Sequence, residues 1–245
     1  MQGTDPLEGH LRRQIEHSRD FFWHRLRWRA VASYLPEDDP FTLVDVGAGA
    51  GLLALFLARD RPQATYHFVE PLQSLERHLE RQHGTDANVR HASRYSGANY
   101  VTLLDVLEHQ AADAAFLAQV VGRMDRGATL ILTVPALRGL WSQWDVDLGH
   151  YRRYDRASLA KVAAGLPVDF VETSFIFPEM VPLAWMRKWR RPVVADSTPE
   201  PESALFPDLP RLINDGLYRC GLLSLALRRL WPAGSSLLAV LRRRR

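Results

Sequence analysis

A glycine-rich loop is the strongest chemical signal in this sequence of 245 residues. Residues 45–51 read Asp-Val-Gly-Ala-Gly-Ala-Gly, and they stand between an apolar run at 41–46 and a helix-like segment at 52–59. Glycines permit a tight turn and let a ligand approach the backbone closely. The helix that follows would offer free N–H groups at its N-terminus. The loop therefore predicts a ligand-binding turn between a strand and a helix.

Glu70 gives this turn a second contact to a ligand. It ends the next predicted strand, 19 residues after Gly51, where an acid can accept hydrogen bonds from both ribose hydroxyls of an adenosine. The third glycine of a G-x-G-x-x-G dinucleotide loop would fall at Leu52, and no lysine of the triphosphate-binding kind follows. A plain tight turn with a surface acid is the structural alternative.

Strands and helices alternate around these residues. Strands are predicted at 41–46, 65–69, 88–91, 100–104, 128–134, 168–177 and 235–241; helices are predicted at 10–35, 52–59, 72–83, 111–124, 156–164 and 211–231. Residues 136–155 are predicted to form a polar, aromatic loop, and an amphipathic patch occupies 180–190. This alternation predicts an α/β fold with a doubly wound, mainly parallel sheet.

The glycine loop with Glu70 resembles motif I of the class I S-adenosylmethionine (SAM)-dependent methyltransferases. The segment Leu-Leu-Asp-Val-Leu-Glu-His at 103–109 is similar to their small-molecule branch, which is related to the quinone-biosynthesis enzymes. The stretches at 140–145 and 149–154, the aromatic start at 21–25 and Ser-Leu-Leu-Ala-Val at 236–240 resemble a bacterial subgroup of type 11 and type 23 domains. The resemblance implies a Rossmann-like sheet of seven strands, with the last, 235–241, antiparallel.

The resemblance also implies a cofactor, SAM, with S-adenosylhomocysteine as its product. The residues assigned to the cofactor are Asp45, Gly47, Gly49, Gly51, Glu70, Pro71, Ser93 and Asp105. Many relatives carry an acid after strand three that holds the adenine amino group. Here residues 91–93 read His-Ala-Ser, so Ser93 or a backbone carbonyl is expected to take its place.

The loop after the fifth strand and the N-terminal helix face the substrate in proteins of this resemblance. His150 is the candidate general base, because an imidazole titrates near neutral pH, and Asp145 is its orienting partner. The candidate substrate contacts are Trp23, His109, Trp141, Trp144, Arg153 and Tyr154. The structural alternative is that these residues brace the loop against the sheet.

No metal is expected. The acidic cluster of catechol-type enzymes is missing near strand five, and no Cys/His set has zinc spacing. The Asn-Pro-Pro-Tyr type of motif, found in enzymes that methylate planar amines such as DNA adenine, is also missing. DNA is therefore not an expected partner, and the lack of a separate nucleic-acid-reading domain argues against RNA.

A single domain is expected over residues 1–245. Residues 1–36 would form a helical cap, 41–177 the SAM-binding core, 178–234 a helical insert, and 235–245 the last strand with a basic tail. Residues 1–177 carry 19 Lys and Arg against 22 Asp and Glu, whereas 178–245 carry 12 against 6. The basic insert is expected to be a lid, a contact with an anionic membrane or a homodimer surface, although its leucines could simply pack in the core.

These patterns predict a cytoplasmic enzyme, with peripheral contact at the inner face of the membrane as an added option. No signal peptide or membrane-spanning run is apparent. The expected reaction is SAM-dependent methyl transfer to a small or a lipid- or sugar-linked acceptor, at oxygen. One alternative is a non-catalytic binding protein on the same fold. The other is an NAD-dependent Rossmann oxidoreductase, which the glycine spacing disfavours.

Overall fold

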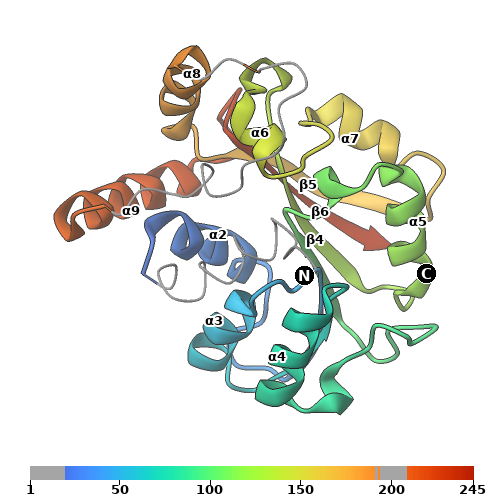
Figure 1. Cartoon of the computed structure of the whole chain (residues 1–245). Coiled ribbons are helices and arrows are strands. Elements are labelled where there is room, and N and C mark those ends of the chain that lie inside the picture. The colour runs from blue at the N-terminus through green and yellow to red at the C-terminus, as the bar shows by residue number, and fades with distance from the viewer. Residues whose placement is uncertain (1–19, 191–192, 194–208) are drawn as a thin grey trace, which may run out of the picture.

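The computed structural model describes residues 20–190, 193 and 209–245, and its centre is a six-stranded sheet (Figure 1). The strands are β1 (Phe41–Val46), β2 (Ala64–Val69), β3 (Tyr100–Leu104), β4 (Thr129–Pro135), β5 (Val168–Ile176) and β6 (Ser236–Arg243). Their order across the sheet is β2-β1-β3-β4-β6-β5. β1 to β4 pair in parallel, and β6 lies between β4 and β5, antiparallel to both. The expected α/β class with an antiparallel last strand is confirmed.

The strand predicted at 88–91 is not formed. Only one bridge, between Asn88 and Phe68, continues the sheet beyond β2. The Asn88 side chain accepts a hydrogen bond from the Arg90 N–H and donates to the carboxylates of Glu76 and Glu80. Because this turn uses the backbone donor of Arg90, pairing stops after a single residue. The described part of the chain therefore has six strands rather than the expected seven.

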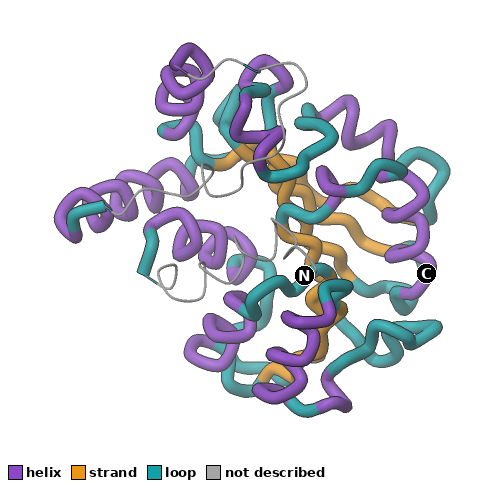
Figure 2. The backbone as a smooth tube through the Cα atoms, viewed as in Figure 1, coloured by secondary structure: helices purple, strands orange, loops and turns teal. Residues whose placement is uncertain are grey.

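Helices cover both faces of the sheet (Figure 2). They are α2 (Phe22–Ala32), α3 (Leu52–Asp60), α4 (Gln73–His83), α5 (Asp113–Arg123), α6 (Gln143–Asp147), α7 (Arg156–Val162), α8 (Met180–Arg190) and α9 (Arg211–Ala226). Alternate residues of the central strand β4 face opposite layers. Leu130 and Leu132 join the buried cluster under α5 and α7, whereas Ile131 joins the cluster under α2 and α3. This double burial explains why the parallel strands are almost continuously apolar.

The first and last helical segments pack on each other. The Asn214 side chain of α9 accepts a hydrogen bond from the Phe22 N–H and donates to the Asp20 carbonyl. Gly221 of α9 lies against Leu26, and a Cβ at this glycine would stand 2.1 Å from the leucine. These contacts hold α2 beside α9 (Figure 1).

The region predicted as an irregular loop at 136–155 contains the short helix α6. Ser142 and Asp145 form a capping box at its start, which the spacing S-x-x-D could have indicated. The predicted helix at 10–35 is observed only as α2, and its residues 10–19 lie outside the described part. Among the described helices, none has the length and apolar composition needed to cross a bilayer.

Candidate functional site

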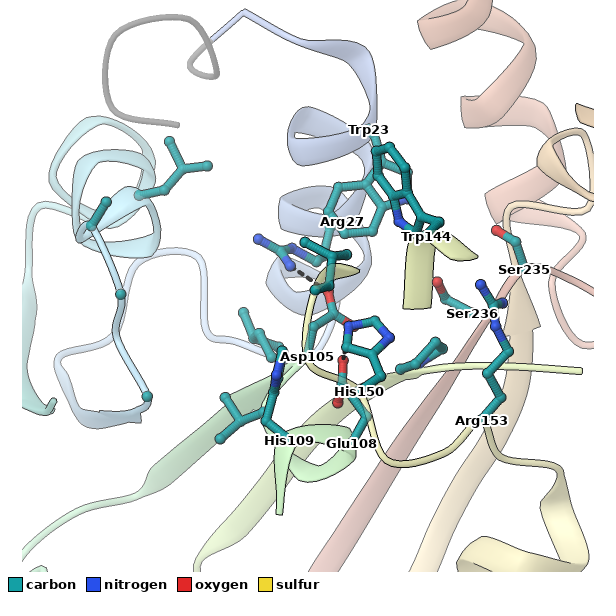
Figure 3. Close-up of a pocket in the computed structure, with 18 of the residues that line it drawn as sticks. Trp23, Arg27, Asp105, Glu108, His109, Trp144, His150, Arg153, Ser235 and Ser236 are labelled. Atoms are coloured by element: carbon teal, nitrogen blue, oxygen red, sulfur yellow. Dashed lines mark hydrogen bonds and ion pairs between the residues drawn. The ribbon is translucent and has the colours of Figure 1, made fainter. Parts of the chain in front are cut away.

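A cavity of about 430 Å³ opens where the parallel strands end (Figure 3). Its volume falls in the range of small-molecule sites. Its walls come from the glycine loop after β1, the ends of β2 and β3, the loop that contains α6, and helices α2 and α8. Because carboxyl ends of parallel strands meet at one edge of the sheet, distant sequence motifs converge here.

The glycine loop forms one side of this cavity. Gly47 has a φ of +75° and Gly51 a φ of +78°, both in the left-handed region that favours glycine. A Cβ at Gly47 would lie 2.5 Å from Val106 Cγ2, so a side chain has no room there. The Gly47 N–H donates to the Val69 carbonyl at 2.8 Å, which ties the loop to the end of β2.

Glu70 is joined directly to the glycine loop. Its carboxylate accepts hydrogen bonds from the Gly49 N–H at 2.7 Å and from the Leu72 N–H at 2.8 Å. The residue is only 3% exposed and lines the cavity. Burial raises the pKa of Glu70 to about 7, although the two backbone hydrogen bonds oppose that shift. The loop and the acid therefore form one preorganised unit.

Asp45 lies beneath this unit. Its carboxylate accepts a hydrogen bond from the Thr102 hydroxyl at 2.7 Å. Burial raises the pKa of Asp45 to about 6, and the Thr102 hydrogen bond partly offsets that effect. Asp45 thus links the ends of β1 and β3 under the cavity floor.

Arg27 of α2 reaches across the cavity to Asp105 (Figure 3). The Arg27 guanidinium donates to the Asp105 carboxylate at 2.5 Å. Its Cζ atom lies over the Trp23 ring, 4.6 Å from the ring centroid. Asp105 has a φ of +55°, which is strained for a residue with a side chain. Its other carboxylate oxygen accepts a hydrogen bond from the Thr133 hydroxyl.

Asp145 and His150 form a buried pair in the next wall. Asp145 Oδ1 lies 3.1 Å from His150 Nδ1 and accepts a hydrogen bond from Arg153 Nε at 2.8 Å. Burial alone would raise the pKa of Asp145, but His150 and Arg153 hold it below its usual value. Because an ionised carboxylate only accepts, His150 Nδ1 carries a proton, and in the neutral imidazole Nε2 is then the acceptor.

Glu108 lies next to this pair and has no exposed surface. Neither of its carboxylate oxygens has a hydrogen-bond partner among the described residues. Burial, together with the carboxylate of Asp105, raises the pKa of Glu108 well above its usual value. A buried carboxyl without a hydrogen bond is costly to the fold, and this makes Glu108 a candidate for a functional role.

The structure gathers most of the sequence-predicted site residues around the cavity. Those that line it are Trp23, Asp45, Gly47, Gly49, Glu70, Pro71, Asp105, His109, Trp144, His150 and Arg153. Asp145 lies just behind His150.

Four predicted site residues lie elsewhere. Ser93 is exposed and outside the lining, and Gly51 packs against Leu79 of α4. Trp141 faces a separate depression on the other side of Arg153. Tyr154 is buried, and its hydroxyl donates to Asp113, as the bracing alternative expects.

Sequence reasoning missed Arg27, Glu108 and the wall that α8 supplies through Met180, Leu183 and Arg187. One arginine among the 29 of this chain carries no distinguishing pattern. Glu108 belongs to the segment at 103–109 that resembles the small-molecule methyl-transfer branch. That its carboxyl oxygens have no hydrogen-bond partner is visible only from the packing of the described residues.

Comparison with known proteins places the chain in a family without assigning its site residues. The family model described as "Methyltransferase domain" matches residues 8–166. No curated protein matches the chain.

Solved structures share the fold at low sequence identity. One comes from the complex of the Haloferax volcanii Trm112 methyltransferase activator with a proposed methyltransferase (12% identity, TM-score 0.59, 97% of this chain and 94% of that one). Another is Haemonchus contortus phosphoethanolamine N-methyltransferase 2 with SAM, with 11% identity and a TM-score of 0.54. This match spans 91% of this chain but 53% of that one. A third is the [4+2]-cyclase SpnF, with 14% identity and a TM-score of 0.55, where the match spans 90% of this chain and 80% of that one.

Proposed function

This chain belongs to the methyltransferase domain family, and from that premise we propose that it transfers the methyl group of SAM to a small or a lipid- or sugar-linked acceptor, at oxygen. The observation that carries the proposal is the joining of Glu70 to the Gly49 N–H across the glycine loop. Residues that lie 21 positions apart are thereby fixed side by side at the cavity edge.

The residues present fit SAM. Glu70 retains lone pairs beyond its two backbone contacts, so its carboxylate can accept hydrogen bonds from ribose hydroxyls. The glycine loop leaves backbone free of side chains beside it. Pro71 follows Glu70 in the cavity lining. SAM supplies an activated methyl group on its sulfonium, so the chain needs mainly to align an acceptor and exclude water.

His150 and Asp145 form the acceptor side of the proposed site. Asp145 holds the proton on His150 Nδ1, and Nε2 can then accept a proton from an acceptor hydroxyl. Arg153 neutralises Asp145 and bonds the Ala136 carbonyl, which fixes the loop. In this proposal Trp23, Trp144 and His109 supply contacts with the acceptor's remaining surface.

Helix α8 suggests how an amphiphilic acceptor could reach the cavity. None of its residues is buried, and Leu183 and Arg187 line the cavity. Trp189 is 81% exposed and stands beside Lys188 and Arg190 on a helix without acidic residues. An exposed tryptophan among cations suits the surface of an anionic membrane, which would place the protein at the inner face. A second copy of the chain is the alternative occupant, and light scattering coupled to gel filtration would detect it.

Calorimetric titration with S-adenosylhomocysteine tests the cofactor proposal. We expect the wild-type protein to bind and Glu70→Ala to lose at least about tenfold in affinity, because hydrogen bonds to a charged group are lost. Glu37→Ala is the matched control, since the Glu37 side chain is 85% exposed and does not line the cavity. No binding by the wild type would leave the fold and contradict the methyltransferase proposal.

The same titration separates the alternatives. Binding of NADH without S-adenosylhomocysteine would favour the oxidoreductase. Tight binding of S-adenosylhomocysteine with no methyl transfer to any of a broad panel of acceptors from labelled SAM would favour a non-catalytic binding protein.

A further inference from the structure

Glu108, His109 and His150 meet at one point of the cavity wall, although His150 lies 41 residues beyond His109 in the sequence. One ligand atom from each lies within 4.8 Å of the others. A backbone hydrogen bond from the Tyr151 N–H to the Glu108 carbonyl, 2.8 Å long, holds the two segments together. Figure 3 shows the His150 ring over the Glu108 carboxyl group, with His109 beside it.

Glu108 differs from the other acids near it in its hydrogen bonding. Asp105 is paired with Arg27, and Asp145 is paired with Arg153. Glu108 is fully buried, and both of its oxygens lack a hydrogen-bond partner in the described structure. A buried carboxylate of this kind is stabilised when a cation binds it.

His150 presents the geometry of an oriented metal ligand. Its Nδ1 is held by Asp145 at 3.1 Å, so its Nε2 is the nitrogen directed toward Glu108. A carboxylate that holds the far nitrogen is the usual support of a metal-binding imidazole. The distance from Nε2 to Glu108 Oε1 is 4.0 Å, too long for a hydrogen bond. Two ligands of one ion, each about 2.1 Å from it, can be up to about 4.2 Å apart.

We propose that Glu108, His109 and His150 form a binding site for a divalent transition-metal ion, with an open coordination position that faces the cavity. Two imidazoles and one carboxylate suit zinc, cobalt, manganese or iron better than magnesium or calcium. With three protein ligands, the ion keeps a position for an oxygen of the acceptor. An ion held there would polarise that oxygen, and His150, as one of its ligands, would then not serve as the general base.

The use of this site in methyl transfer rests on the proposed function, but the binding of the ion does not. From the sequence no metal is expected, and two adjacent residues with one distant histidine match no spacing motif. Only the packing of the loop that contains α6 against the end of β3 brings the three together.

Titration with cobalt chloride tests this site on the full-length, untagged protein after treatment with a chelator. Bound Co²⁺ is followed by its visible absorption, and calorimetry with ZnCl₂ gives the stoichiometry. We expect one equivalent of ion per chain.

Glu108→Gln keeps the size of the side chain and removes its charge, and we expect it to weaken ion binding at least about tenfold. His150→Ala should do the same, whereas His91→Ala, at an exposed histidine, should bind as the wild type does.

Thermal unfolding and S-adenosylhomocysteine binding are measured on the same samples, so that a misfolded variant is recognised. Two outcomes overturn the inference: a wild-type protein that binds no stoichiometric ion, and folded Glu108→Gln and His150→Ala proteins that bind it as tightly as the wild type. If S-adenosylhomocysteine binds and the ion does not, only this inference fails. If the ion binds and S-adenosylhomocysteine does not, only the proposed function fails.

Discussion

Arg27 and Asp105 form an ion pair that joins helix α2 to the end of β3, 78 residues away in the sequence. Both side chains are largely buried, with 16% and 20% of their surfaces exposed. The pair bridges the cavity wall, and Asp105 keeps its strained backbone there. The N-terminal helix is therefore part of the site's electrostatics and also packs on the core.

We predict that Arg27→Met lowers the free energy of unfolding by about 1–3 kcal/mol, because the largely buried Asp105 loses its ion-pair partner and keeps only the Thr133 hydrogen bond. The variant should also bind acceptor more weakly, since α2 carries Trp23 into the cavity. Arg29→Met on the same helix is the control, because Arg29 is exposed. Denaturant unfolding of the three proteins measures the effect, and equal losses in both variants would contradict it.

The glycine loop allows a second matched comparison. Gly47→Ala places a Cβ against Val106 at a φ of +75°, whereas Gly97→Ala has a φ of +77° and open space. The control should lose roughly 1–2 kcal/mol of stability from backbone strain alone. Gly47→Ala should lose more stability than this control and should bind S-adenosylhomocysteine poorly. Adding Val106→Ala should recover part of the loss, and an unchanged double variant would show that the close contact is not the cause.

Much of the fold follows from local sequence patterns. The apolar strands at 41–46 and 100–104 have the predicted bounds, because burial on both faces leaves a clear signal. The strand predicted at 88–91 does not form, because the Asn88 side chain accepts a hydrogen bond from the Arg90 N–H and strand pairing ends there. Apolar patterning in the sequence does not register this effect. Helix α6 was missed because it is only five residues long.

For the site, too, local sequence patterns could be predicted and effects of side-chain packing could not. The glycine loop and Glu70 could be found because they belong to one strand–turn–helix–strand unit with fixed spacing. Arg27 and Glu108 could not, because their roles depend on which charges lack or find a partner after folding. Tyr154 was predicted to face substrate, yet its hydroxyl bonds Asp113 on the inner side of the loop.

The pKa of Glu70 predicts a pH dependence of stability. Its folded value, about 7, lies above its ordinary value of 4.5. Between these two pH values the folded state binds more protons than the unfolded state, so stability falls as pH rises from about 4.5 to 7 and then levels off. Asp45, raised to about 6, contributes in the same direction.

Glu70→Gln removes one of these titrations, so the free energy of unfolding of the wild type minus that of the variant should decline as pH rises from 5 to 7. Thermal unfolding of both proteins at several pH values in that window, without ligand, measures it. Parallel curves for the two proteins would contradict the shifted pKa. Glu37→Gln, at an exposed carboxylate, should parallel the wild type.

The exposed tryptophan of α8 predicts binding to anionic vesicles. We expect the protein to sediment with vesicles that contain phosphatidylglycerol and to stay in solution with pure phosphatidylcholine, since the cations of α8 attract negative headgroups. Trp189→Ser should weaken this binding at least about threefold, because the indole no longer enters the interface. Val171→Ser is the control, as Val171 is 61% exposed on β5. Added salt should weaken the binding of all three proteins through charge screening. Equal sedimentation with both kinds of vesicle, or no loss in Trp189→Ser, would contradict a membrane role for α8 and favour a second copy of the chain as its partner.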